Sequence, residues 1–490
     1  MTLVATAKRL LPTNRFARSV SILAGGTAAG QALLVLAAPI LTRLYTPEDF
    51  GLLAVFAALL AIIAVIASLR YEAAIPLPDD DVEAAHIVVS SLIIVATIAL
   101  SSFVVVALLG SSIAAKLNVP GLAGYLWLLP LGVLFAGSYK VFNYWAIRSK
   151  AFTAIARTKL TQAVSTIALQ IGGFMLGPLA LVLGQIAGQA AGTSSLGALA
   201  LRKRWSVFRQ VRVSGIKTVL VRYRRFPLFS TADGLLNTAS THVPMLLFAG
   251  LFSPAAAGVY ALAQRVLAVP MSLIGRSVAH VFYAEGAASL REGRLGAAVS
   301  TIYCQLTRIA IVPALLVILI GPELFAMVFG AEWRVSGELA RWMAPWLFFQ
   351  FVSSPLSIVY FVLERQDHNL AFQTLLFSSR TIALVAGAWI GSFETAVILF
   401  ALTSAACYVG MLIWINALVG NDAILLLRPG ATSLALGLVV VSPLAAAAWL
   451  SFDISGWLAA SGASAILSGV VGWRVIMKGG NARMAQGVAS

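Results

Sequence analysis

The sequence predicts an all-α polytopic membrane protein with about fourteen transmembrane helices, arranged as two parallel six-helix lobes plus a C-terminal helix pair. Of the 490 residues, 60% are hydrophobic and only 11% are charged, which is too little charge to solvate a soluble protein of this length. Apolar runs of about 20 residues, each long enough to cross the hydrocarbon core of a bilayer, recur from end to end. The chain also contains an internal repeat.

A short frame marks this repeat. Leu44–Ala54 and Leu251–Ala261 share the order Leu, aromatic, hydroxyl, Pro, followed by Gly and Ala four and seven positions after the proline. Thr46 and Ser253 are good N-cap residues, and a proline at the first helical position loses no hydrogen bond. Each copy therefore predicts the start of a helix.

Gly51 and Gly258 fall one turn into these helices, where a small residue lets another helix approach closely. We expect alanine to be tolerated at both positions and leucine to fail. A second match, Ile167–Gly172 with Ile382–Gly387, lies in the fifth helix of each half. Six helices in each half make the two repeats parallel.

The expected spans are 19–42, 52–75, 84–109, 123–147, 155–177, 179–201, 227–250, 258–282, 297–320, 339–362, 370–390, 395–418, 432–451 and 455–476. They group into an N-lobe (1–201), a basic inter-lobe linker (202–226), a C-lobe (227–418) and an additional helix pair (432–476).

A net charge of +16 would suggest a nucleic-acid partner for a soluble protein, but here the positive-inside rule accounts for it, so no nucleic acid is expected. The cations gather in alternate turns, including Arg148, Lys150, Arg157 and Lys159 and the segment Arg202–Arg225. We therefore expect both termini in the cytoplasm. The basic segment is expected either to lie as an amphipathic stretch on the cytoplasmic leaflet or to act only as a linker.

Cations inside the spans mark the candidate site. Each costs roughly 2.5–3.5 kcal/mol at a helix centre, and the carboxylates inside the spans are too few to neutralise them. The simplest resolution is a water-filled cavity that accepts an anionic substrate. The candidate substrate-binding cations are Lys140, Arg265, Arg276, Arg380 and Arg308.

Helical spacing indicates which polar residues share a face with these cations. Arg265 and Arg276 return to one side of the eighth span, followed by His280, and Gln373 aligns with Arg380. The polar lining is therefore expected to be Asp233, Asn237, Gln373 and His280. The alternative for Arg308, Arg276 and His280 is that they extend toward the membrane surface. Gln185 and Gln189 suggest interhelical hydrogen bonding rather than a site.

Nothing in the sequence suggests catalysis. Cys304 and Cys407 lie in separate apolar spans, and the four histidines lack metal-ligand spacing. There is no glycine-rich phosphate loop and no nucleophile–base constellation. We expect no enzyme activity, no cofactor and no metal.

Three segments near the start of the chain, Ile22–Gln31, Pro39–Gly51 and Leu69–Pro78, resemble Wzx-type oligosaccharide flippases, the polysaccharide-biosynthesis branch of the multidrug/oligosaccharidyl-lipid/polysaccharide exporter superfamily. The resemblance implies translocation of an undecaprenyl-diphosphate-linked oligosaccharide by alternating access of two lobes around a cationic cavity. It also implies a bacterial inner-membrane location, contact with membrane lipids, and cooperation with a glycan polymerase and chain-length machinery.

Two other functions remain open. A multidrug or cation antiporter shares the architecture but is expected to keep carboxylates for ion coupling. A membrane glycan polymerase or ligase is expected to carry a large periplasmic loop with basic residues, and the longest outward loop here is only about Gly321–Glu338.

Overall fold

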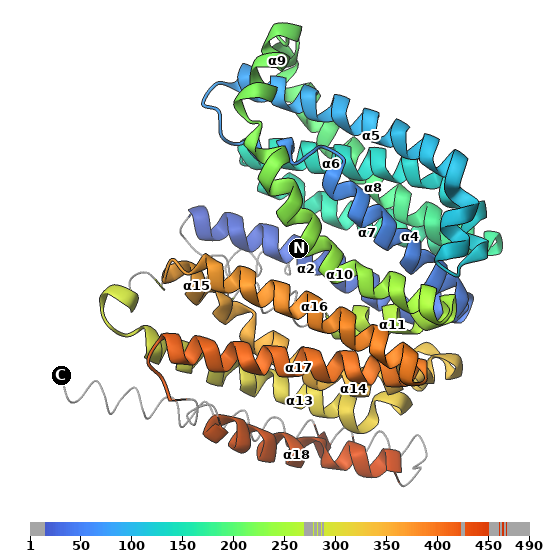
Figure 1. Cartoon of the computed structure of the whole chain (residues 1–490), viewed down its shortest axis with the longest axis vertical. Coiled ribbons are helices and arrows are strands. Elements are labelled where there is room, and N and C mark those ends of the chain that lie inside the picture. The colour runs from blue at the N-terminus through green and yellow to red at the C-terminus, as the bar shows by residue number, and fades with distance from the viewer. Residues whose placement is uncertain are drawn as a thin grey trace, which may run out of the picture. The chain divides into compact units, whose positions relative to one another are not determined.

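A computed structural model describes residues 15–268, 289–422 and 427–449, together with the single positions 278, 282, 286, 460, 463, 464 and 467. Every regular element in these residues is helical (Figure 1), which confirms the predicted all-α class. The chain forms two compact units, Met1–Val269 and Pro270–Ser490.

The long helices of the first unit are α2 (Arg15–Leu36), α3 (Ala38–Leu44), α4 (Pro47–Ile66), α5 (Asp81–Lys116), α6 (Leu129–Arg148), α7 (Phe152–Gly172), α8 (Pro178–Phe208), α9 (Val213–Arg222), α10 (Thr231–Leu251) and α11 (Pro254–Leu267). Short turns connect them: η1 (Tyr71–Ala74), η2 (Pro120–Gly124), η3 (Leu126–Leu128), η4 (Phe174–Leu176) and η5 (Phe226–Ser230).

The second unit contains α13 (Leu295–Phe329), α14 (Arg334–Ser353), α15 (Ile358–Val362), α16 (Gln366–Ile390), α17 (Phe393–Leu418) and α18 (Leu427–Trp449), with the turns η7 (Ala331–Trp333) and η8 (Pro355–Ser357). Its core forms where α14 packs on α13 and α17, and where α16 packs on α17. Trp346 of α14 meets the edge of Phe400 of α17 there, at 5.3 Å between ring centres. The predicted span 455–476 lies almost wholly outside the described residues.

Eight segments of the described chain are long and apolar enough to cross a membrane, judged by length and composition. Helices α7 and α8, which correspond to the predicted spans 155–177 and 179–201, are not among them. Both helices carry several glutamine, threonine and basic residues, which lower their hydropathy.

The two repeat frames begin helices as predicted. Thr46 caps α4 and receives the backbone N–H of Asp49 at 3.3 Å, while the Asp49 carboxylate accepts the N–H of Thr46 at 3.0 Å. Ser253 caps α11 by accepting the N–H of Ala256 at 3.1 Å. The helices therefore start at the prolines, several residues before the predicted spans 52–75 and 258–282.

The expectation that alanine would be tolerated at the two frame glycines is wrong. A methyl group on Gly51 would overlap the carbonyl oxygen of Pro254, and one on Gly258 would overlap that of Pro47. In both cases the obstacle is backbone, which cannot move aside as the end of a flexible side chain can.

Helix α4 ends at Ile66, earlier than predicted. Leu69 and Arg70 adopt left-handed conformations with φ of 49° and 61°, which an α-helix cannot contain. The chain turns there into η1 before the long helix α5 begins.

Asp81, the first residue of α5, joins distant parts of the first unit. Its carboxylate accepts hydrogen bonds from Arg148 at the end of α6 (3.0 Å) and from Arg204 of α8 (2.9 Å). Arg204 has non-helical backbone angles, so α8 bends at this residue. The acidic turn before α5 and the basic segment therefore lie at the same end of the first unit.

Candidate functional site

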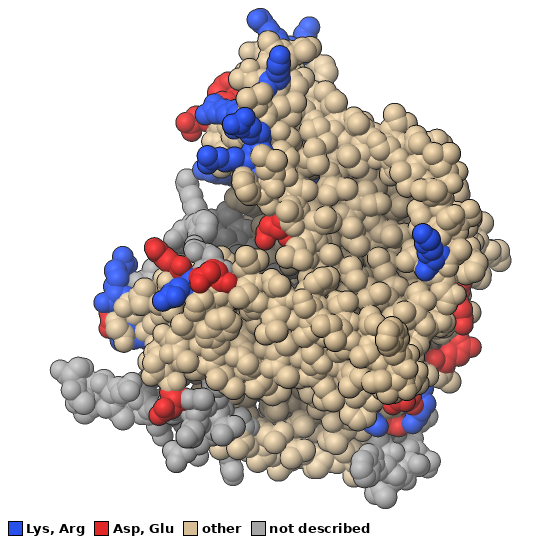
Figure 2. Space-filling view, in the orientation of Figure 1, with Lys and Arg blue, Asp and Glu red and all other residues tan. Residues whose placement is uncertain are grey.

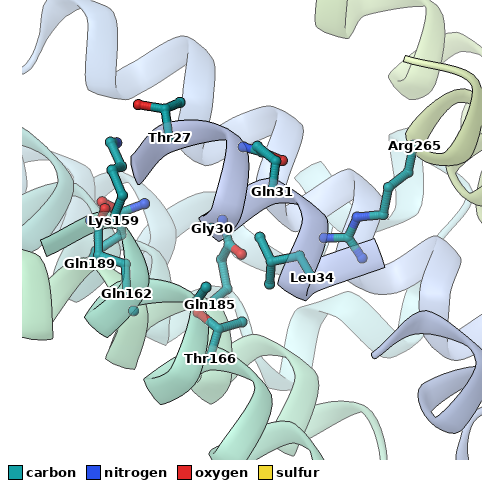
Figure 3. Close-up of a pocket in the computed structure, with 12 residues that line it drawn as sticks. Thr27, Gly30, Gln31, Leu34, Lys159, Gln162, Thr166, Gln185, Gln189 and Arg265 are labelled. Carbon is teal, nitrogen blue, oxygen red and sulfur yellow. The ribbon is translucent and has the colours of Figure 1, made fainter. Parts of the chain in front are cut away.

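The first unit contains a polar cavity of about 280 Å³ (Figure 3). Four helices line it: α2, α7, α8 and α11. The lining residues are Thr27, Gly30, Gln31, Leu34, Lys159, Gln162, Ala163, Thr166, Gln185, Gly188, Gln189 and Arg265.

Helical periodicity explains how these residues share one space. On α7, Lys159, Gln162 and Thr166 lie three and four positions apart, so they follow one another along a single face. Gln185 and Gln189 are separated by one turn on α8. Helices α7 and α8 thus each present a row of polar side chains to the cavity.

Small residues allow α2 and α8 to approach α7 closely. Gly30 of α2 lies over the backbone of Lys159, where an added Cβ would be 3.0 Å from the carbonyl oxygen. On α8, a methyl group at Gly188 would overlap the Thr166 hydroxyl, and one at Gly192 would overlap the Gln162 amide. Glycines four residues apart are a common solution for close helix packing in membranes. Here they bring the polar faces together.

The fixed charge of the cavity is positive. Lys159 and Arg265 both line it, and its lining residues include no carboxylate. The Lys159 ammonium also lies 4.8 Å from the centre of the Tyr139 ring, which holds the lysine by a cation–π contact. In Figure 3, Lys159 and Arg265 lie on opposite sides of Gln31.

The neutral lining can both donate and accept hydrogen bonds. Its polar neutral groups are four glutamine amides and two threonine hydroxyls. Such a site can hold an anionic group between its cations and hydroxyl groups against its amides.

Of the predicted site residues that the structure describes, only Arg265 lines this cavity. Lys140 lies elsewhere in the first unit, where its ammonium donates to the carbonyl oxygen of Ala64 at 2.8 Å. Asp233 and Asn237 are exposed on α10 and are not part of the cavity lining.

In the second unit, Arg380 of α16 is only 9% exposed. Its Nε donates to the Ser404 hydroxyl at 2.8 Å, and its guanidinium lies 4.8 Å from the Trp346 ring, 5.3 Å from Phe400 and 5.6 Å from Tyr408. The arginine is thus enclosed by aromatic side chains.

Arg308 is exposed on α13, and Gln373 is half-buried on α16. Arg276 and His280 lie outside the described residues.

Lys159 was not expected to line a site, because its charge was grouped with the cations of a cytoplasmic turn; the structure places it within α7. Gln185 and Gln189 were expected only to form hydrogen bonds between helices. The signal that could have identified them is a polar face at helical spacing, repeated on two consecutive and weakly apolar spans.

The chain resembles known proteins in both sequence and fold. The family model described as polysaccharide biosynthesis protein matches residues 40–338. No match was found among curated proteins.

Several solved structures share the fold. A lipid II flippase MurJ in an inward closed conformation superposes with a TM-score of 0.71 at 12% identity, covering 93% of this chain and 99% of that one. An inward-facing multidrug resistance MATE transporter of the MOP superfamily gives a TM-score of 0.64 at 15% identity, with 80% and 94% covered. A MOP superfamily transporter from Pyrococcus furiosus, described as having a binding pocket of reverse polarity, gives 0.53 at 13% identity, with 82% and 96% covered.

At these identities the structural matches establish only the fold, which this chain shares with the MATE and MurJ structures. The family model spans more than half of the sequence, including the repeat frames and the cavity residues of α7 and α8. The chain therefore belongs to the polysaccharide biosynthesis protein family.

Proposed function

We propose that this protein is a flippase, not an enzyme, that moves an undecaprenyl-diphosphate-linked oligosaccharide across the cytoplasmic membrane by alternating access. The product would supply O-antigen, capsule or exopolysaccharide biosynthesis. Membership in a polysaccharide biosynthesis family and the fold shared with a lipid II flippase support a transporter of this kind.

The cavity in the first unit is the observation that carries the proposal. Lys159 and Arg265 line it without a carboxylate beside them, so its fixed charge favours an anion. A diphosphate brings more than one negative charge at neutral pH. Arginine binds phosphate through two parallel hydrogen bonds, whereas lysine acts as a compact point charge. In a cavity of low dielectric these contacts are stronger than in water.

The amide side chains of the cavity suit a sugar. Gln162, Gln185 and Gln189 offer donors and acceptors that match neutral hydroxyl groups. We therefore assign affinity to the two cations and selectivity for the glycan to the amides. Gln373 and Asn237, which the sequence predicted as polar lining, do not line this cavity.

A multidrug or cation antiporter is the second candidate because MATE transporters share the fold. A cation substrate calls for carboxylates in the binding cavity, and this cavity has cations instead. The charge therefore favours the flippase.

The proposal includes location and partners. The proposed location is the bacterial inner membrane with both termini in the cytoplasm. The basic segment and the basic end of α6 lie at the same end of the first unit, which the positive-inside rule assigns to the cytoplasm. A glycan polymerase and its chain-length machinery would then receive the substrate on the opposite side.

The test is reconstitution of the purified protein into liposomes with a fluorescent undecaprenyl diphosphate that carries one sugar. We expect the protein to speed the appearance of the probe on the far leaflet, measured with a membrane-impermeant quencher. Liposomes containing heat-inactivated protein provide the control. Failure to move the probe, together with uptake of cationic drugs, would overturn the flippase assignment in favour of the antiporter.

A further inference from the structure

A basic surface segment, residues 202–226, comprises the end of α8, helix α9 and the link to the start of η5. It contains no aspartate and no glutamate. Figure 2 shows Lys and Arg side chains gathered over α9 at the top of the view. The exposed cations of the segment are Arg202, Arg204, Arg209, Arg212, Lys217, Arg222, Arg224 and Arg225.

Two of these cations are neutralised within the first unit. Arg204 pairs with Asp81 at 2.9 Å, and Arg222 pairs with Glu83 at 2.8 Å. Within the described residues, no ion pair involves the remaining six. The segment therefore presents an excess of positive charge that the described part of the protein does not balance.

The inner face of α9 is attached firmly to the first unit. Val219 is only 3% exposed, and the Tyr71 hydroxyl donates to the carbonyl oxygen of Leu220 at 2.9 Å. The backbone N–H of Arg212 donates to Nε2 of His86 at 3.0 Å. These contacts fix which side of α9 faces outward.

The outward face combines its cations with apolar side chains. Val213 is 83% exposed and Val221 is 59% exposed, while Trp205 at the end of α8 is 57% exposed. Leu228 and Phe229, immediately after the segment, are 65% and 70% exposed. Apolar and aromatic side chains among lysines and arginines are typical of a helix lying in the membrane interface.

We propose that the outward face of residues 202–226 is a binding site for the headgroups of anionic phospholipids in the adjacent leaflet. Arg209, Arg212 and Lys217 would contact the phosphates, while Trp205 and Val213 enter the boundary between headgroups and acyl chains. The segment runs between the predicted membrane spans 179–201 and 227–250, so it remains at the bilayer surface. A soluble acidic protein would match the charge, but it would leave the exposed apolar side chains without a function.

The first experiment measures lipid preference and needs no transport substrate, so its outcome is separate from that of the proposed flippase function. The full chain is reconstituted into phosphatidylcholine vesicles with a trace of spin-labelled phosphatidylglycerol or spin-labelled phosphatidylcholine. Electron spin resonance then gives the motionally restricted fraction of each probe. We expect a preference for phosphatidylglycerol that falls in about 1 M salt, where charges are screened within about 3 Å.

The variant Arg209→Gln/Arg212→Gln/Lys217→Gln should lower this preference, by at most about five-fold for each cation in full contact with the surface. The matched control Lys116→Gln/Arg291→Gln/Arg365→Gln removes three exposed cations from other parts of the chain and should keep the preference. Equal loss in both variants would mean that net charge alone matters, and the site assignment would be wrong.

A second measurement tests insertion and relies on no loss-of-charge variant. A solvatochromic label is attached at Val213→Cys in a background with Cys304→Ser and Cys407→Ser. We expect its emission to shift to the blue when phosphatidylglycerol is added to phosphatidylcholine vesicles. Emission typical of water in both lipid mixtures would overturn the proposal and leave the face available to a soluble acidic partner.

Discussion

Gly51 on α4 and Gly258 on α11 pack against each other reciprocally, each glycine lying over the first turn of the other helix. A Cβ on Gly258 would be 2.8 Å from the backbone nitrogen of Gly51 and would overlap the carbonyl oxygen of Pro47; a Cβ on Gly51 would overlap that of Pro254. The two copies of the repeat frame are therefore in direct contact.

This contact predicts that Gly51→Ala and Gly258→Ala each destabilise the protein. Inserting a methyl group into a packed interface costs about 1–3 kcal/mol, and here the obstacle is backbone. The measurement is the thermal unfolding temperature of purified protein in detergent. Gly410→Ala is the control because no atom lies within 4 Å of its added Cβ, so it should be neutral or stabilising. Unchanged unfolding temperatures for all three variants would contradict the close contact.

The cavity predicts loss of transport without loss of protein when its charges are removed. Lys159→Ala and Arg265→Ala each remove a charge-assisted hydrogen bond worth about 1.5–3 kcal/mol, or roughly ten- to hundred-fold in affinity. Binding of undecaprenyl diphosphate to reconstituted protein should fall accordingly. Arg157→Ala is the matched control, an exposed cation two residues before Lys159 on the same helix. If all three variants weakened binding of undecaprenyl diphosphate to the same extent, the cavity cations would have no special role.

Arginine and lysine differ in how they bind phosphate, so Arg265→Lys separates geometry from charge. We expect this variant to retain part of the binding because the charge is kept, and to lose part because the two parallel hydrogen bonds are lost. Gln185→Ala and Gln189→Ala should change which glycan is accepted more than they change binding of the bare diphosphate carrier. If the bare carrier fails to compete with the glycosylated one even in large excess, affinity does not come from the diphosphate.

Arg380 requires a different expectation from the other cations. Because it is enclosed by Trp346, Phe400 and Tyr408, Arg380→Ala should leave an internal void and lower both unfolding temperature and abundance. Arg308→Ala, at an exposed position, should change neither. Normal unfolding with abolished transport would instead identify Arg380 as a substrate-binding group.

His86 and Gly215 predict a non-additive pair. A methyl group on Gly215 would overlap the His86 ring, whose Nε2 also accepts the N–H at the start of α9. Gly215→Ala and His86→Ala should each loosen α9 and increase hydrogen exchange over residues 205–226. In the double variant the ring is gone and the methyl group has space, so exchange should not exceed that of His86→Ala alone. Additive effects would exclude this contact.

The two ends of α5 predict the membrane topology of the first unit. Its first turn contacts Arg204 and Arg222 of the basic segment, whereas Gly121 follows its far end after a helix of 36 residues. Topology reporters fused at Arg212 and at Gly121 should therefore report opposite sides of the membrane, with Arg212 in the cytoplasm. The same signal from both fusions would exclude α5 as a spanning helix.

Local signals in the sequence correctly predicted that helices are present, but they predicted the first and last residues of those helices poorly. The N-cap and proline pairs at Thr46 and Ser253 correctly predicted helix starts because capping depends on neighbours in the chain. Hydropathy missed the end of α4 at Ile66, because the chain stays largely apolar up to Ile75 although Leu69 and Arg70 adopt left-handed conformations. The boundaries of the lobes and linker remain predictions.

The sequence alone determined the all-α membrane class, the helices and the excess of cations within the apolar spans, because hydropathy, capping and charge are read along the chain. Only the tertiary structure decided which polar residues meet. Helical periodicity tells which residues share a face, as for Lys159, Gln162 and Thr166, but not which face of another helix lies opposite. Close packing at Gly30, Gly188 and Gly192 brings α2 and α8 against α7. Lys159 of α7 and Arg265 of α11 then line one cavity, and Lys140 lies outside it.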